Sequence, residues 1–302
     1  MSAITTGNHP KALWPGVKDF FGAMYNEHPK EYVDLFEVVS SDKSYEEYVK
    51  TTSFGLVPKK PEGQGVTYDT HSQEWVKRIT NIAYGMGYIV TKEELDDNLY
   101  LEKSFPRAKM LAFSLRQTEE NVGANVYNRA FNSSYTGGDG KELLATDHPT
   151  ASGDQSNELS TAADLSEASL EDLLIQIQQA KNDRGLKISL MGQCLIVPPA
   201  LSFEAERIVK SSLQNDSANN AVNAIRSMGL LPKGIKVNHY LSDDDAWFVR
   251  TNCPDSLLWQ DRVMAQFTQD NDFDTENAKA KVYRRFEASW ADWRGLFGSP
   301  GA

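Results

Sequence analysis

Cysteine is scarce in this chain of 302 residues, which contains only Cys194 and Cys253. Two isolated cysteines provide neither the paired framework of a disulfide-stabilised domain nor the clustered ligands of a metal site. Cys194 lies in an apolar run and Cys253 in the segment TNCPD, and we expect both to be reduced thiols. This pattern is typical of a protein that is assembled in the cytosol.

Long hydrophobic runs are also missing. No apolar run approaches the roughly 20 residues that cross a bilayer, and no charged leader precedes an apolar stretch at the N-terminus. The sequence therefore predicts neither a membrane span nor a secretion signal. With 40% hydrophobic and 24% charged residues, the composition is that of a globular protein with a sizeable core.

Clustered positive charge is the third absence. The chain carries 42 acidic and 31 basic side chains, a formal net charge of −11, and no run of Lys or Arg is longer than Lys59-Lys60. Binding to a nucleic-acid backbone requires clustered cations that neutralise phosphates. The sequence thus argues against strong nucleic-acid binding, although an acidic protein can still lie beside nucleic acid.

No convincing catalytic motif is present either. Asp147, His148 and Asp154 could form a metal-binding or acid–base cluster, but no second histidine stands at metal-ligand spacing. We interpret His148 as a hydrogen-bonded residue of a turn. The sequence therefore predicts no catalytic, cofactor-binding or metal-binding residue and no cofactor. A metal-dependent hydrolase that uses these three residues is the minor alternative.

The C-terminal segment has the clearest pattern in the chain. From Ala278 to Trp290 the even positions are mainly apolar and the odd positions mostly polar, which is typical of a strand with one buried face. Apolar residues at spacings of three and four in this region also fit a helix. Periodicity leaves the choice open, but both interpretations place the segment in a core.

The first ninety residues change character twice. Apolar residues recur at helical spacing over 14–24, and the stretch 32–49 indicates an extended arm. Residues 51–90 begin with a part rich in proline and glycine that excludes a helix, and they continue with β-branched and aromatic alternation. We expect a long two-stranded loop that projects from the body. Because an isolated ribbon is marginally stable, it needs a partner surface.

The middle of the chain predicts a long helix followed by an α/β region. Residues 91–131 show helical periodicity in two runs divided at Pro106. Within residues 142–255, Ser166 or Ser169 is expected to cap a helix. The other elements expected in this region are a helix carrying Phe203, Ile208, Val209 and Leu213 and short strands at 194–197, 235–240 and 246–249.

Three segments carry a resemblance to a known family. Residues 143–149 (LLATDHP), followed by Gly153 and Asn157, are similar to a stretch of phage major head proteins, including those of the Mu-like group. Residues 195–201 (LIVPPAL) resemble the strand-to-helix step of their axial domain. The ending DFDTENAKAKVYRRF…DWRGLFGS resembles their closing strand, which favours a strand at 278–290. The chain therefore resembles the major capsid proteins of tailed phages (Caudoviricetes), which have the Hong Kong 97-type fold.

The resemblance implies an α+β fold and covers nearly the whole chain in order. The long spine helix is expected within 106–131. The parts implied are an N-terminal arm at 1–50, an extended β loop at 51–90, a peripheral domain at 91–149 and 256–302 that includes the spine helix, and an α/β axial domain at 150–255.

The resemblance also implies a function. Such a protein is a structural subunit and not an enzyme, and it self-assembles as hexamers and pentamers into an icosahedral virion head around double-stranded DNA. An acidic subunit suits this task, because DNA that is pumped in and later released must not be held by strong cationic sites. The implied partners are further copies of the chain and a portal, scaffolding or decoration protein, with DNA held without sequence specificity and no membrane. The implied location is the phage head, assembled in the host cytoplasm.

The extended loop is the part expected to contact a neighbouring subunit. Its candidate contact residues are Phe54, Val57, Lys59, Lys60, Gly63 and Gly65. Some family members crosslink a loop lysine to an asparagine of a neighbour, but nothing in this sequence identifies a partner or a catalytic acid, so we predict no crosslink. The arm begins close to the N-terminus, which leaves no room for a cleaved scaffolding segment, so we expect a separate scaffolding protein or none. An encapsulin-type compartment shell, which shares the fold, and a monomeric binding module stay open as alternatives.

Overall fold

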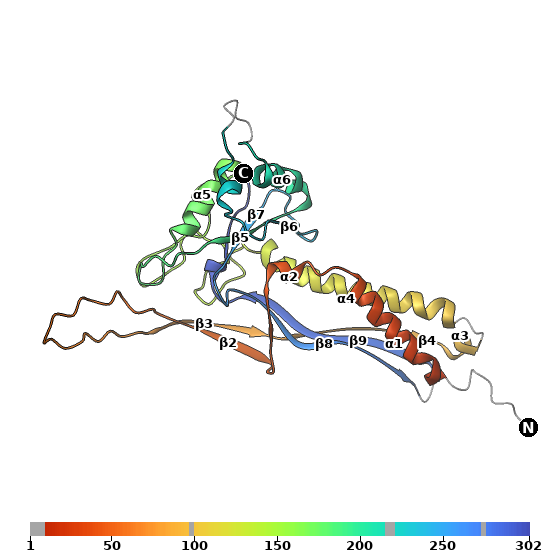
Figure 1. Cartoon of the computed structure of the whole chain (residues 1–302). Helices are drawn as coiled ribbons and strands as arrows, with labels where there is room; N and C mark the ends of the chain where they lie inside the picture. The colour runs from red at the N-terminus through yellow and green to blue at the C-terminus, as the bar shows by residue number, and fades with distance from the viewer. Residues whose placement is uncertain (1–9, 97–99, 215–220, 273–275) are drawn as a thin grey trace, which may run out of the picture.

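The computed structural model describes residues 10–96, 100–214, 221–272 and 276–302, so the first nine residues of the expected arm lie outside the described part. An elongated layer of sheet and helices lies below an α/β lobe, and a hairpin projects from one end (Figure 1). The helices are α1 Pro10–Glu27, α2 Tyr32–Leu35, α3 Lys92–Asp96, α4 Tyr100–Asn128, α5 Glu167–Gln178, α6 Ser202–Lys210 and α7 Ala224–Met228, with short 3-10 helices η2 Pro199–Leu201 and η3 Trp293–Gly295. The strands are β1 Glu37–Ser40, β2 Tyr45–Thr51, β3 Gln73–Thr80, β4 Ile82–Val90, β5 Gly192–Val197, β6 Ile235–Val237, β7 Trp247–Thr251, β8 Leu257–Asn271, β9 Ala278–Trp290 and β10 Leu296–Ser299.

The lower layer is a four-stranded sheet with the strand order β1-β8-β9-β4. β1 runs parallel to β8, and the other two pairs are antiparallel. In β9, which is 13 residues long, the even positions are buried and the odd positions are more exposed. α4 and α1 pack on the buried face (Figure 1). The strand interpretation of 278–290 is therefore confirmed, because β8 and β4 satisfy the backbone of β9 on both sides.

The N-terminal helix expected at 14–24 is confirmed as α1. Phe21 is buried and stacks on Phe267 of β8, with 4.8 Å between the ring centroids. Phe20 and Met24 pack on the same cluster, which also holds buried side chains of α4 and β9. The helical spacing of these residues thus reflects one face that is buried against the lower layer.

The arm that follows is less extended than the sequence predicts. Residues 32–35 form α2, and only then does the chain enter β1 beside β8. Tyr32 stacks on Trp259 of β8 with 3.9 Å between ring centroids. Gly123 of α4 allows this close approach, because a Cβ at that position would lie 3.3 Å from the Cβ of Tyr32. Aromatic burial against α4 and β8 therefore bends the arm into a helical turn.

The projecting part of the chain ends earlier than residue 90. β2 and β3 pair with each other as an antiparallel ribbon, whereas β4 pairs along its whole length with β9 in the lower sheet. Asn81 lies between β3 and β4, and its Nδ2 donates to Ser41 Oγ at 2.9 Å and to the carbonyl of Lys43 at 3.0 Å. The second half of 51–90 is thus strand, as expected, but residues 82–90 belong to the body. We call residues 45–80 the hairpin and residues 52–72 the hairpin tip.

α4 is the long helix, and it contains Pro106 instead of beginning after it. Pro106 is the seventh residue of this 29-residue helix, so it removes one intrahelical hydrogen bond, and the helix nevertheless continues through it. The apolar stripe expected along it is confirmed, because Leu111, Leu115 and Val126 are buried and Val122 is partly buried. The helix ends at Asn128, where Nδ2 donates to the carbonyl of Tyr240 at 3.2 Å, three residues before the end that the sequence predicts.

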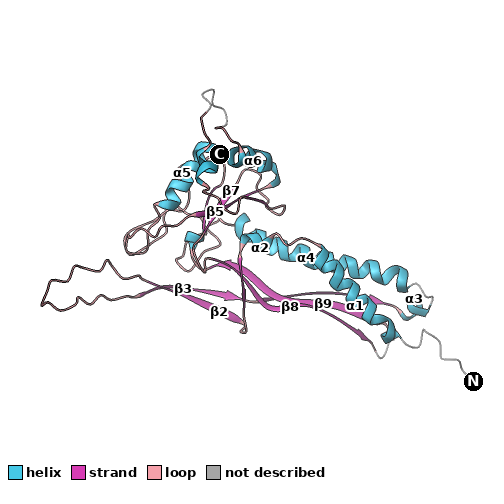
Figure 2. Cartoon of the chain, in the orientation of Figure 1, coloured by secondary structure: helices cyan, strands magenta, loops and turns pink. Residues whose placement is uncertain are grey.

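The lobe, which contains β5 and β7 (Figure 2), holds the second four-stranded sheet. Its strand order is β10-β7-β5-β6. Ser166 caps α5: its hydroxyl accepts from the N–H of Ser169 at 3.1 Å, and the Ser169 hydroxyl accepts from the N–H of Ser166 at 2.9 Å. The strand expected at 194–197 is the buried C-terminal part of β5, and the strand expected at 246–249 is β7. The strand expected at 235–240 is shorter, because β6 ends at Val237 and residues 239–240 form a turn.

The helix expected to carry Phe203 and Leu213 differs at both ends. α6 buries Ile208 and Val209, as predicted, but Phe203 is 78% exposed. Phe203 stands in the first turn, away from the face that Ala205 and Ile208 bury against the lobe core. Leu213 lies beyond the end of α6 at Lys210.

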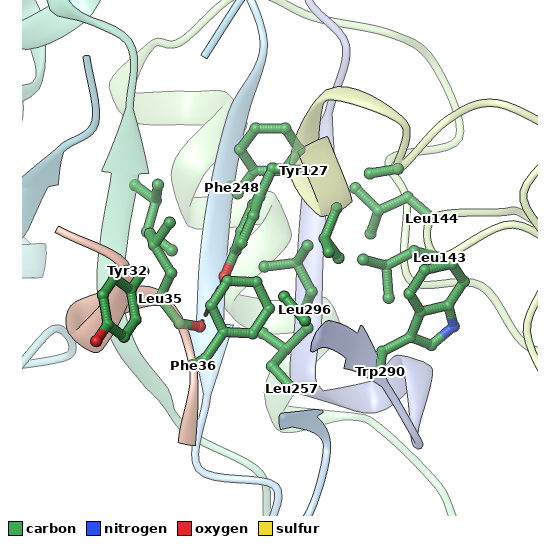
Figure 3. Close-up of a cluster of buried hydrophobic side chains, with 14 of the residues drawn as sticks. Tyr32, Leu35, Phe36, Tyr127, Leu143, Leu144, Phe248, Leu257, Trp290 and Leu296 are labelled. Atoms are coloured by element: carbon green, nitrogen blue, oxygen red, sulfur yellow. Dashed lines mark hydrogen bonds between the residues drawn. The ribbon is translucent and has the colours of Figure 1, made fainter. Parts of the chain in front are cut away.

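The two layers share a core (Figure 3). Tyr127 of α4 makes an edge contact with Phe248 of β7, with 5.4 Å between centroids, and its hydroxyl donates to the carbonyl of Leu35 at 2.9 Å. Leu296 of β10 and Leu257 of β8 belong to the same buried cluster. Because β9 lies in the lower sheet and β10 in the lobe sheet, the C-terminal segment joins the layers covalently as well.

Candidate functional site: the projecting hairpin and its anchorage

The hairpin tip carries a group of large apolar side chains that face solvent. Phe54 is 59% exposed, Leu56 79%, Val57 94%, Val66 61% and Tyr68 90%. Large exposed apolar side chains that gather in one segment mark a surface that contacts another molecule. The tip is therefore the best candidate for the functional surface of this chain.

All six residues predicted to contact a neighbour are exposed in the tip, and the ring of Phe54 also makes an edge contact with His71: Phe54, Val57, Lys59, Lys60, Gly63 and Gly65. Gly63 has a φ of +79° in a turn that the N–H of Gln64 closes on the carbonyl of Pro61, a conformation that favours glycine. Leu56, Val66 and Tyr68 are at least as exposed as Phe54 but were not among the candidates. Their apolar character next to proline and glycine was the signal that could have identified them.

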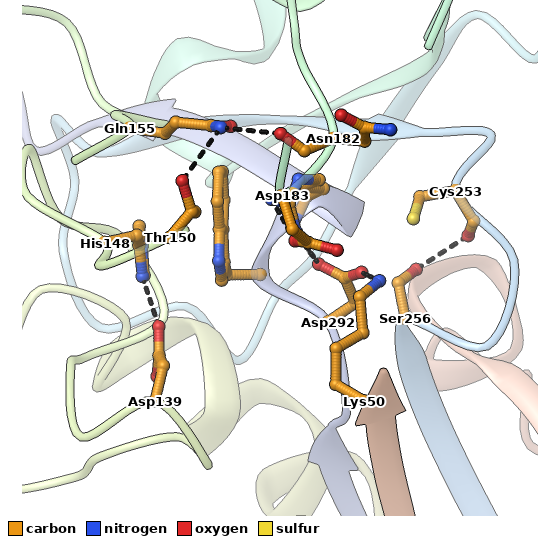
Figure 4. Close-up of polar contacts among 12 residues, drawn as sticks. Lys50, Asp139, His148, Thr150, Gln155, Asn182, Asp183, Cys253, Ser256 and Asp292 are labelled. Carbon is orange, nitrogen blue, oxygen red and sulfur yellow. Dashed lines mark hydrogen bonds and ion pairs between the residues drawn. The ribbon is translucent and has the colours of Figure 1, made fainter. Parts of the chain in front are cut away.

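The base of the hairpin is tied to the body by charges (Figure 4). Lys50 Nζ of β2 lies 2.5 Å from Asp292 Oδ2, and Asp292 Oδ1 lies 3.3 Å from Arg294 Nη1. Arg294 Nη2 in turn lies 2.9 Å from Asp183 Oδ1. Burial opposes ionisation of Asp292, but Arg294 and Lys50 outweigh it and hold its pKa below the usual range. Sequence analysis missed this cluster, because its members lie far apart in the chain.

His148 is part of a hydrogen-bonded cluster and is completely buried. Its Nδ1 lies 2.7 Å from Asp139 Oδ2 (Figure 4). Its Nε2 lies 3.1 Å from Asn157 Oδ1, and its ring stacks on Trp293 with 4.3 Å between the ring centroids. Both ring nitrogens are thus engaged by protein partners. This arrangement supports the interpretation of His148 as a structural residue of a turn.

The other two residues of the alternative hydrolase site do not join His148. Asp147 forms an ion pair with Lys141, and Asp154 is exposed. Across the described ranges, no group of three or more His, Cys, Asp or Glu side chains is arranged to hold a metal ion. The geometry therefore gives the metal-dependent hydrolase no support.

Asn157 is the centre of the cluster around His148. Its Nδ2 donates to the carbonyls of Leu143 at 2.8 Å, Trp293 at 3.1 Å and Leu296 at 2.9 Å, and its Oδ1 accepts from the N–H of Ala145 at 3.0 Å. We expect Asn157→Ala to lower the free energy of unfolding by about 2–4 kcal/mol, because it leaves several buried backbone groups unpaired. Urea denaturation of the unassembled protein measures this change.

Asn121→Ala is the matched control for that prediction. Asn121 is exposed on α4 and donates only to the carbonyl of Gln117 in its own helix, among the hydrogen bonds of the described residues. Its replacement is expected to change the stability by less than about 0.5 kcal/mol. Equal stabilities of the two variants would show that the Asn157 hydrogen bonds do not hold the cluster together.

A second charge cluster is buried between α1, α4, β8 and β9. Arg284 of β9 lies at its centre, forms an ion pair with Glu119 and lies 2.6 Å from Asp261 Oδ1. Arg284 Nη1 also donates to the hydroxyl of Tyr25 at 2.6 Å, and this hydroxyl donates to Glu119 at 2.5 Å. Arg116 lies 2.5 Å from Glu119 and donates to the carbonyl of Tyr25. The cluster thereby fixes α1 on the lower layer.

Glu287 faces a cavity of about 560 Å³ that Arg129, Tyr135 and Trp290 also line. Burial raises the pKa of Glu287 to about 7, although the N–H of Ala288 and the charge of Arg129 oppose this. A carboxyl whose pKa is raised by folding stabilises the folded state below its unfolded pKa, and this stability is lost as pH rises through about 7.

We therefore expect Glu287→Gln to match the wild-type protein at pH 4 and to exceed its stability at pH 8 by on the order of 1–2 kcal/mol, a value reduced for partial exposure of the side chain. Denaturation curves at several pH values measure the difference. Glu62→Gln in the exposed tip serves as the control, and its stability should not differ from that of the wild-type protein at any of these pH values. A difference between Glu287→Gln and wild type that does not grow with pH contradicts the prediction.

The sequence of this chain matches a known protein family. A family model described as phage capsid protein matches residues 77–298, which is most of the chain. The chain belongs to this family. The protein is thus a structural capsid protein, located in the virion. No curated protein sequence matches it.

Solved structures that resemble this capsid protein show the same fold. A virus-like particle from Pyrococcus furiosus is 12% identical with a TM-score of 0.55, and the match covers 95% of this chain and 99% of the other. The capsid of an empty GTA particle is 9% identical with a TM-score of 0.52, and Microbacterium phage Oxtober96 is 10% identical with a TM-score of 0.51; both matches cover 90% of each chain. The predicted α+β, Hong Kong 97-type fold is confirmed. No described helix meets the length and apolarity that crossing a membrane requires.

Proposed function

We propose that this capsid protein assembles as hexamers and pentamers that close into an icosahedral phage head around double-stranded DNA, and that it does so without catalytic activity. The observation that carries the proposal is the hairpin tip, which projects away from the body of the chain (Figure 1) and whose large apolar side chains are exposed. Such side chains gain stability when a second surface covers them. In a symmetric shell, an adjacent copy of the chain provides that surface.

A closed shell can be stable even though each contact of a hairpin tip with a neighbouring subunit is weak. One tip offers only a narrow ribbon, so a single contact between two subunits contributes little. A closed shell makes many such contacts simultaneously, and once one contact of a subunit is formed the others become intramolecular. The ion pair of Lys50 with Asp292 ties the hairpin to the body and supports the proposal, because a contact that holds the hairpin in place reduces the conformational entropy that assembly would otherwise cost.

The charge of the chain supports enclosure of DNA without tight binding. A net charge of −11 repels a nucleic-acid backbone over the surface as a whole. We place assembly in the host cytoplasm, in keeping with the free thiols of Cys194 and Cys253. The further partners proposed are a portal and a scaffolding or decoration protein.

A shell that encloses proteins instead of DNA is the second candidate. It is favoured by the match to a virus-like particle, which reaches the highest TM-score of the three structures compared above. The contents of particles made with the complete set of phage proteins distinguish the two: nuclease-protected DNA supports the phage head, and a bound enzyme supports the compartment.

Mass photometry of the purified chain tests the assembly proposal. Species of five and six times the 33.8 kDa subunit mass are expected, together with larger shells. A protein that stays monomeric at every concentration, with and without co-expressed scaffolding protein, contradicts the proposal and supports a monomeric binding module.

The absence of a covalent crosslink is a separate prediction. Lys59 and Lys60 are exposed in the tip, and the structure shows no ion pair or hydrogen bond from either side chain to another described residue. Particles boiled in denaturant should therefore run on a gel as a single band of the subunit mass. A ladder of multiples would contradict this, and its loss in Lys59→Arg or Lys60→Arg would identify the lysine that reacts.

A further inference from the structure

The loop at residues 181–187 of the lobe contacts the hairpin tip of the same chain. Arg184 Nη1 lies 2.8 Å and 3.1 Å from the two carboxylate oxygens of Asp69, and Arg184 Nη2 donates to the carbonyl of Thr70. Among the hydrogen bonds and ion pairs of the described residues, those that join residues 53–71 to the rest of the chain all involve Arg184. Apart from contacts within the hairpin itself, the tip is thus attached to the rest of the chain by one guanidinium group.

Asp69 extends this contact to both arms of the tip. Its Oδ2 also accepts from the N–H of Gly55, at 2.8 Å, across the ribbon. The N–H groups of Gly55 and Thr70, and then the Arg184 guanidinium, hold the pKa of Asp69 below its usual range. Because the carboxylate is ionised at neutral pH, Arg184 is linked through the side chain of Asp69 to both arms of the tip.

The loop that presents Arg184 is itself held in place. Asn182 Oδ1 accepts from the N–H groups of Arg184 at 3.0 Å and Leu186 at 2.8 Å, and Gln155 Nε2 donates to the carbonyl of Asn182 at 2.9 Å (Figure 4). Asp183, next in sequence to Arg184, is buried against Arg294. The two adjacent residues therefore form successive attachments: Asp183 attaches the loop to the body, and Arg184 attaches the tip to the loop.

Two attachments at different points along the hairpin define its direction. The first is the ribbon itself, where Lys50 pairs with Asp292, the Tyr48 hydroxyl accepts from Gln260 Nε2 at 2.8 Å and Lys77 donates to the carbonyl of Thr136 at 2.8 Å. The second is the contact of Arg184 with Asp69 further out. The register of β2 and β3 shifts between Val49 and Thr51, and no ladder continues into the tip. With the base attachment alone, the ribbon beyond Thr51 would be free to swing.

We propose that Arg184 is an intrachain brace that sets the direction in which the hairpin projects, so that the tip is oriented for a neighbouring subunit before contact. The proposal rests on the proposed function only in its second part, the consequence for assembly. An exposed ion pair biases one orientation modestly, by about fivefold. Because closure of a shell requires many subunits to be oriented at once, a modest bias in each becomes a large effect on the assembly.

The orientation is measured on the unassembled chain. Spin labels at Gln64→Cys in the tip and Asp172→Cys on α5, in a Cys253→Ser background, report the distance between tip and lobe by pulsed electron spin resonance. With Arg184 present, one narrow distance distribution is expected. Arg184→Ala and Asp69→Asn should each broaden it, whereas Arg226→Ala should leave it narrow. Arg226 is a fair control because it lies on the same lobe and donates to the carbonyl of Lys210.

Shell assembly is measured separately with the same variants. Arg184→Ala should reduce the yield of closed shells by about tenfold relative to Arg226→Ala, with unchanged thermal unfolding of the subunit. A narrow distance distribution in Arg184→Ala overturns the brace. A broad distribution with a normal yield overturns its role in assembly. If the wild-type chain forms no shells at all, the proposed function fails, and the spin-label measurement still decides on the brace.

Discussion

Deletion of residues 56–66 is expected to leave a soluble, folded subunit that cannot form closed shells. The deleted segment carries Leu56, Val57 and Val66, all more than half exposed, so the core loses nothing. Gly55 and Asp69, which hold the two arms together, stay in place. Circular dichroism and the thermal midpoint should match those of the wild-type chain, whereas electron microscopy should show no closed particles.

Lys59→Ser combined with Lys60→Ser is the matched control for the deletion. This variant keeps the length and the apolar side chains of the tip and removes only two charges. Closed shells are expected to form, because the contact that we propose is mainly apolar. Normal particles from the deletion variant would refute the assignment of the tip as the contact surface.

Replacement of Arg284 by methionine is expected to cost about 3–5 kcal/mol of folding free energy. Arg284 is buried at the centre of the cluster with Glu119, Asp261 and Tyr25. Its removal leaves the Glu119 carboxylate with Arg116 as the remaining cation and leaves Asp261 without the guanidinium. Guanidinium chloride denaturation of the unassembled subunit measures the loss.

Arg285→Met is the matched control for this measurement. Arg285 is the next residue of β9, faces the opposite side of the sheet and donates to the carbonyl of Asn81 at 3.4 Å. Its replacement should change the stability by less than about 1 kcal/mol. If the two variants are equally stable, the buried cluster does not hold α1 and α4 on the sheet.

Arg284 also shows how far sequence periodicity reaches. The alternation over 278–290 places residue 284 on the buried face, and the structure confirms that face. Periodicity alone did not explain a charged residue there, because the groups that neutralise Arg284 come from α1, α4 and β8. Pairing between elements that are distant in sequence is decided by tertiary packing, which a local pattern does not encode.

The hairpin shows the same limit at another point. Proline and glycine in 51–66 predicted a projecting segment, and the exposure of Val57 agrees with that prediction. The sequence did not show where the projection returns to the body, because residues 73–80 and 82–90 have the same strand-like composition. Hydrogen bonds of Asn81 with the segment around Ser41 separate the two strands, and this contact becomes visible only in three dimensions.

The assignment as a capsid protein depended on a different kind of information. In the described part of the chain no group of three or more His, Cys, Asp or Glu side chains is arranged to hold a metal ion, and His148 belongs to a hydrogen-bonded cluster. The order of arm, loop, helix, lobe and closing strand carried the prediction, together with short motifs such as LLATDHP. The contact residues of the tip stay a prediction, since exposure shows that they are available and not what they bind.

Electron microscopy of the chain expressed alone, combined with light scattering, tests the central claim most directly. The account predicts closed shells or rings of five and six subunits, and hairpin density that crosses onto the adjacent subunit in a reconstruction. Closed particles in which every hairpin folds back on its own subunit would contradict the proposed contact. A strict monomer that stays monomeric with its scaffolding protein would contradict the claim that this chain builds the shell.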